Sequence, residues 1–163
     1  MMLGLSLHAV TILHVVISLV AIVAGFIVLF GMFKSQSMPG MTAFFLITTI
    51  LTNATGFMFP FEKLLPSHII AILSLVLLAI ACYALYGAKL SGSWRAIYVI
   101  TAVASLYFNV FVLVIQGFLK VGPLHELAPS VPPNEPPFAI VQGIVLVLFV
   151  LAGIRAVRRF HPA

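Results

Sequence analysis

Long apolar runs separated by short polar and Pro/Gly-rich breaks dominate this chain of 163 residues. A helix needs about 20 mostly apolar residues to cross the hydrocarbon core of a bilayer. The pattern therefore predicts an all-α integral membrane protein, a bundle of five transmembrane helices forming a single membrane domain over residues 1–163. We expect the spans near residues 7–33, 41–59, 67–88, 96–119 and 137–157.

The breaks between these runs carry turn-forming residues. The longest break, residues 120–136, contains five prolines. Proline fixes φ and lacks a backbone N–H, so we expect this outer loop to be semi-rigid and extended rather than helical. The first run has no basic flank and no clear small-residue cleavage site, and we expect it to be retained as a span.

The distribution of charge predicts how the bundle is oriented. If the N-terminus is outside, only Lys63 and Lys120 of the eight basic residues fall on the outer side. Cytoplasmic loops carry the excess of Lys and Arg, so we expect an N-terminus outside and a cytoplasmic C-terminus in a bacterial inner membrane. The six basic residues on the cytoplasmic side are Lys34, Lys89, Arg95, Arg155, Arg158 and Arg159.

Composition excludes several classes of protein. With 63% hydrophobic and 7% charged residues, the chain is neither a soluble domain nor a disordered one. Its net charge of +5 is scattered between apolar runs, which is not the basic patch of a nucleic-acid-binding protein. A single cysteine, Cys82, cannot form a disulfide within the chain. No paired nucleophile and base, catalytic carboxylate pair or nucleotide-binding glycine motif indicates an enzyme class.

Polar side chains within the runs gather in the predicted outer half of the bundle. An imidazole or amide inside hydrocarbon is costly and needs hydrogen-bond partners, so it is a candidate functional group. We therefore expect an outward-facing polar cavity that binds a small molecule or ion. Its candidate ligand-binding residues are His14, Thr49, Thr52, Asn53, Asn109 and Gln116.

Helix packing offers a second explanation for the same residues. Hydroxyl and small side chains commonly hold membrane helices together. A direct hydrogen bond between Asn53 and Asn109 would also satisfy both amides without a ligand.

A second group of candidates lies at the predicted outer mouth. The topology brings His8, Glu62, His68, His125 and Glu126 to this side of the membrane. Imidazole and carboxylate groups bind Zn, Cu, Ni or Fe, so these residues could form a metal site. No metal-binding sequence motif supports that site, and solvated interfacial side chains explain the residues better.

Three functional hypotheses follow. In the first, the cavity binds a metal ion or a redox cofactor, either a quinone or a b-type haem. His14 and His68 do not match in depth, which disfavours haem with two histidine ligands, whereas a quinone needs only one good partner for each carbonyl. In the second, the chain is a transporter or channel subunit, because intramembrane polar residues often mark a transport path. In the third, it is an accessory or assembly subunit of a homo-oligomer or larger membrane complex.

Overall fold

The computed structural model describes residues 7–36, 38–56, 66–120, 122–127 and 135–161, and the regular elements in these ranges are all helical. A π-helical turn, η1, directly continues one of the long helices. The elements, in chain order, are α1 (Leu7–Phe33), α2 (Pro39–Gly56), α3 (Pro66–Cys82), η1 (Tyr83–Gly87), α4 (Trp94–Lys120), α5 (Gly122–Leu127) and α6 (Pro136–Arg159).

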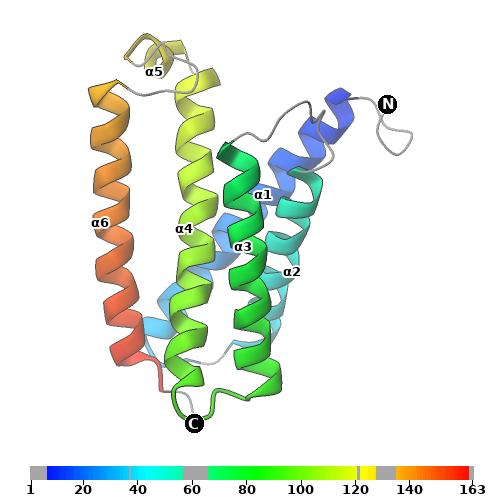
Figure 1. Cartoon of the computed structure of the whole chain (residues 1–163), viewed down its shortest axis with the longest axis vertical. Helices are drawn as coiled ribbons and strands as arrows, with labels where there is room; N and C mark the ends of the chain where they lie inside the picture. The colour runs from blue at the N-terminus through cyan, green and yellow to red at the C-terminus, as the bar shows by residue number, and fades with distance from the viewer. Residues whose placement is uncertain (1–6, 37, 57–65, 121, 128–134, 162–163) are drawn as a thin grey trace.

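The five long helices run alternately in opposite directions (Figure 1). α1 pairs with α2 and α3 pairs with α4, while α6 packs on α4 and also contacts α1. As a result, α1 begins and α6 ends at opposite ends of the bundle. We call the end where α1, η1 and α6 terminate the basic end, because six basic residues lie there, and we call the other end the distal end. The six are Lys34, Lys89, Arg95, Arg155, Arg158 and Arg159.

Four of the helices contain segments long and apolar enough to cross a membrane. Outward-facing apolar side chains such as Ile144, Leu148 and Leu151 of α6 are exposed, and such faces contact lipid in a bilayer. α2 is not among the four, because five threonines and Asn53 lower the hydropathy of its 18 residues. The chain is a multi-pass membrane protein with spanning-length segments at Ile12–Phe33, Ile69–Gly87, Trp94–Ile115 and Pro136–Arg159.

The proline-rich segment differs in part from the expectation. Residues 122–127 form the short helix α5, so the prediction of an extended loop is wrong for these six residues. Pro123 is the second residue of α5, where a backbone N–H has no intrahelical partner to lose. The same reason allows α6 to begin with two prolines, Pro136 and Pro137. Residues 128–134 lie outside the described residues.

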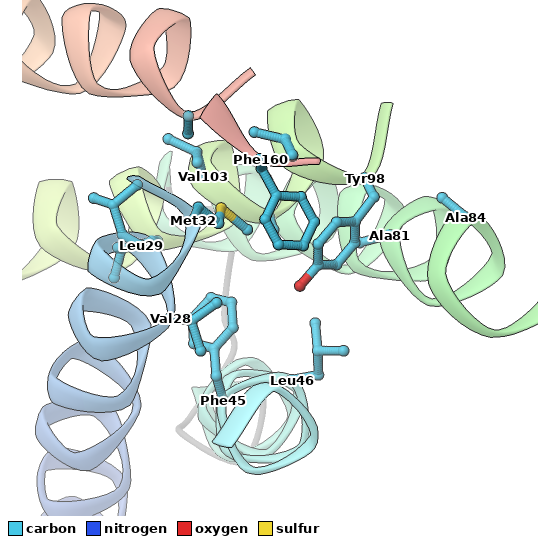
Figure 2. Close-up of a cluster of buried hydrophobic side chains, with 14 of the residues drawn as sticks. Val28, Leu29, Met32, Phe45, Leu46, Ala81, Ala84, Tyr98, Val103 and Phe160 are labelled. Carbon is cyan, nitrogen blue, oxygen red and sulfur yellow. The ribbon is translucent and has the colours of Figure 1, made fainter. Parts of the chain in front are cut away.

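The apolar core occupies the half of the bundle next to the basic end (Figure 2). α1 contributes its C-terminal half, α2 and α4 their N-terminal halves, and α3 with η1 the last turns before the chain reverses. Phe160, directly after α6, packs its ring against Tyr98 of α4 with centroids 6.1 Å apart. Each long helix therefore contributes to this core the part of its sequence that lies nearest the basic end.

A close approach of three helices marks the boundary of this core. A Cβ added at Gly25 of α1 would lie 2.5 Å from the Cδ1 of Leu106 in α4 and 2.8 Å from the Cε1 of Phe45 in α2. A larger residue at Gly25 would force these side chains apart, because real Cβ atoms do not approach other atoms this closely. We call this contact between Gly25, Phe45 and Leu106 the waist.

Candidate functional site

Most buried positions of α2 on the distal side of the waist are polar. They include Thr48, Thr49, Thr52 and Thr55. Thr48 donates to the Phe44 carbonyl at 2.7 Å, and Thr52 donates to the Thr48 carbonyl at 2.8 Å. Such bonds to a carbonyl four residues earlier satisfy a hydroxyl within its own helix. Thr52, a predicted ligand-binding residue, is thus bonded inside α2.

Asn53 joins two helices. Its Nδ2 donates to the Thr49 carbonyl and to the Ser74 hydroxyl of α3, both at 3.1 Å. The hypothesis of a direct bond between Asn53 and Asn109 is therefore wrong. Ser74, only 1% exposed, was not expected as a partner, and its signal in the sequence was a single hydroxyl within the apolar stretch Ile69–Cys82.

His14 connects α1 to α2. The half-buried imidazole lies with its Nδ1 2.7 Å from the Thr55 hydroxyl oxygen. Thr55 also bonds to the Leu51 carbonyl of its own helix, at 2.9 Å. The histidine predicted from the sequence is thus placed beside the polar face of α2, in the distal half.

Two buried polar groups on α2 and α4 have no hydrogen-bond partner among the described residues: Thr49 Oγ1 and Asn109 Nδ2. Thr49 is fully buried and Asn109 is 8% exposed. Thr49 follows Phe45 of the waist by four residues, and Asn109 follows Leu106 by three. Both helices run toward the distal end, so a rise of about 1.5 Å per residue places both groups roughly 5–6 Å beyond the waist. We call Thr49 and Asn109 the unpartnered pair.

The two groups of this pair differ in the hydrogen bonds that they can form. A side-chain amide nitrogen is a hydrogen-bond donor only, and a threonine hydroxyl can donate or accept. Leaving such a group buried and unpaired costs about 1–3 kcal/mol, and most buried polar groups in proteins are paired. A hydrogen-bond acceptor on a ligand would satisfy the Nδ2 of Asn109, and either an acceptor or a donor would satisfy the hydroxyl of Thr49.

A third unpartnered atom lies on α6. Gln142 donates from Nε2 to the Phe111 carbonyl at 3.1 Å, while its Oε1 has no partner in the described part of the chain. Gln142 was not among the predicted site residues. A single amide in an otherwise apolar run was the signal that could have identified it.

The predicted metal site falls mostly outside what the structure describes. Glu62 and the side chains of His8, His68 and His125 lie outside the described residues. The side chain of Gln116, a predicted ligand-binding residue, lies outside them as well. Glu126 is exposed on α5. Among the residues searched in the described ranges, no group of three His, Cys, Asp or Glu could hold a metal ion.

Basic side chains close the opposite end by binding helix termini. Arg95 donates from one guanidinium nitrogen to the carbonyls of Val157, at 2.7 Å, and Phe160, at 2.9 Å. Arg159 donates to the Phe33 carbonyl at the end of α1, at 3.1 Å. The last carbonyls of a helix lack intrahelical partners and attract positive charge. These arginines therefore have structural roles.

No protein-family model, curated protein or solved structure matches the chain.

Proposed function

We propose that this chain is a ligand-binding protein of a bacterial inner membrane whose distal half binds the headgroup of a quinone. Asn109 carries the proposal, because its buried Nδ2 has no partner among the described residues. An N–H donor complements a carbonyl oxygen, whereas a metal ion requires a lone pair. A quinone carbonyl therefore suits Asn109 better than a cation does.

Two further residues of the distal half support the same ligand class. Thr49, in the same layer on α2, can donate a second hydrogen bond to an oxygen. His14 of α1 also lies in this half, and its imidazole is hydrogen bonded to the Thr55 hydroxyl. In the proposed site, Asn109 and Thr49 bind a carbonyl, and His14 lines the approach from α1.

The proposal includes five spans with the N-terminus outside. α2 has 18 residues, which at about 1.5 Å per residue gives roughly 27 Å, close to the thickness of the hydrocarbon core. Bonds to its own carbonyls reduce the penalty for burying its threonine hydroxyls. With α2 counted as a span, the basic end faces the cytoplasm by the positive-inside rule and the quinone site lies toward the outer surface.

Quinone binding can be tested on the whole protein in lipid nanodiscs. Quinone carried through purification is extracted and identified, and a short-chain benzoquinone is then titrated into the quinone-depleted protein. Asn109→Leu should weaken binding about tenfold, the effect of one buried hydrogen bond. Ser105→Ala is the matched control, because the Ser105 hydroxyl is bonded within α4 to the Thr101 carbonyl at 2.9 Å.

Three outcomes would overturn the proposal. The wild-type protein could neither retain nor bind a quinone, or Asn109→Leu could bind it as tightly as wild type does. A haem absorption band or a stoichiometric metal ion in the purified protein would instead assign the chain to one of the other cofactors.

A further inference from the structure

A cavity of about 80 Å³ lies at the basic end, away from the unpartnered pair. It opens where the α1–α2 connection, η1, the first turns of α4 and the segment after α6 converge. Figure 2 shows four of its lining side chains turned toward one another: Val28, Met32, Tyr98 and Phe160. Leu85 of η1 and Leu90 of the following turn complete the apolar wall.

Polar groups occupy one side of this cavity. The Tyr98 hydroxyl points from α4 toward α2 (Figure 2), and Thr42 of α2 also lines the cavity. Gln36 lies in the α1–α2 connection and is exposed at the rim. The cavity is thus an apolar chamber with a few hydrogen-bonding groups, the usual character of a small-molecule site.

Two lysines are close in sequence to residues that line the cavity. Lys34 precedes Gln36 by two residues, Lys89 precedes Leu90, and both lysines are exposed. The described carboxylates, Glu126 and Glu135, belong to the distal end, so neither lysine has an acidic neighbour in the described part of the chain. Arg95 and Arg159, in contrast, bind helix termini. The two lysines are therefore available for an anionic ligand.

The backbone around Leu85 and Leu90 adopts an uncommon conformation. The end of α3 continues as the π-helical turn η1, and the chain then passes through Lys89 and Leu90 at φ values of 53° and 60°. A bulky residue rarely adopts this left-handed conformation, and the surrounding structure must hold it there. π-Helical turns in helical proteins are frequently associated with functional sites.

We propose that this pocket binds one anionic phospholipid of the surrounding bilayer. The phosphate lies between Lys34 and Lys89, and the ester region with its first methylenes enters the chamber beside Tyr98 and Thr42. The cavity is smaller than the roughly 150 Å³ cavities that accept benzene, so it suits a short stretch of lipid rather than a ring. Basic pockets between transmembrane helices are suited to anionic headgroups, and this one lies at the end of the apolar segments.

Native mass spectrometry of the detergent-solubilised protein, at low ionic strength, can measure retained lipid. The probes are phosphatidylglycerol, phosphatidylcholine with the same acyl chains, and soluble glycerol 3-phosphate. We expect one phosphatidylglycerol to be retained in preference to phosphatidylcholine. Lys34→Gln/Lys89→Gln should weaken its binding about 30-fold, since each basic residue contributes about a factor of five.

Two further variants distinguish the pocket from general attraction. Arg155→Gln/Arg158→Gln removes the same charge from the same end but leaves the residues lining the pocket intact, and it should keep phosphatidylglycerol binding within about threefold of wild type. Leu85→Phe fills the chamber without changing charge and should weaken binding.

An equal loss of phosphatidylglycerol binding in the lysine and arginine variants would overturn the proposal, because it would show that the lipid is attracted by the overall positive charge of this end. Unchanged lipid binding by Leu85→Phe would show that the lipid does not enter the cavity. Glycerol 3-phosphate binding as tightly as the lipid would show that the ligand is a soluble phosphate.

Discussion

The two halves of the bundle differ in how completely their polar groups are hydrogen bonded. At the basic end, Arg95 and Arg159 satisfy the terminal carbonyls of α6 and α1, and an apolar core lies directly beneath. In the distal half, polar side chains enter the interior, and Thr49 and Asn109 are buried without partners among the described residues. The arginine bonds at the basic end should therefore stabilise the fold, while the two unpartnered groups of the distal half should lower stability until something binds them.

The largest effect should come from Arg95. Arg95→Met removes both bonds to the end of α6, and bonds to a charged group contribute about 1.5–3 kcal/mol each, so we expect a loss of at least about 3 kcal/mol. Thermal unfolding in detergent measures this change. The control, Arg158→Met, changes an exposed arginine of the same helix and should shift stability by less than about 0.5 kcal/mol. Equal shifts would show that the carbonyl bonds contribute nothing beyond charge.

Gly25 tests the boundary between the halves. Gly25→Ala places a methyl group against Leu106 and Phe45 and should destabilise the protein by about 1–3 kcal/mol. A Cβ at Gly143 of α6 meets no atom within 4 Å, so Gly143→Ala should be neutral or stabilising by up to about 1 kcal/mol. If the two variants unfold at the same temperature, the waist does not limit how the helices pack.

The two asparagines should respond with opposite signs. Asn53→Leu breaks the link to Ser74 and should cost about 1 kcal/mol. Asn109→Leu removes an unpartnered group and should stabilise the ligand-free protein by about 1 kcal/mol. The measurement is thermal unfolding of both variants and the wild-type protein after bound small molecules have been removed. Destabilisation of the same size in both would mean that Asn109 already has a partner in the protein alone.

This contrast shows where sequence reasoning succeeds and where it stops. The apolar runs located all five long helices, because length and hydropathy are local properties. The roles of Asn53 and Asn109 depend on how the helices are rotated against each other, which no single run encodes. The sequence therefore identified both amides as candidate site residues, but it left open whether they bond to each other, which the structure excludes.

The basic end was underestimated for a similar reason. Arg95 was counted only as an orientation signal, yet its partners, Val157 and Phe160, lie more than sixty residues later in the chain. The cavity beside Tyr98 also left no polar signature, since most of its lining side chains are apolar. The turn of α5 was missed because proline was treated as excluding a helix, although it is tolerated in the first turn.

The smallest expected effect comes from two neighbouring threonines that differ in whether their hydroxyl has a hydrogen-bond partner. Thr48 and Thr49 are adjacent and buried on α2, but only Thr48 bonds to a carbonyl of its own helix. Thr48→Val should cost about 0.5 kcal/mol for the lost bond, whereas Thr49→Val should be neutral or stabilising by a similar amount. Added benzoquinone should raise the unfolding temperature of Thr48→Val more than that of Thr49→Val, because bound ligand stabilises only a protein that keeps its site. Identical responses would mean that Thr49 contributes nothing to the site, and Asn109 alone would then have to account for the ligand.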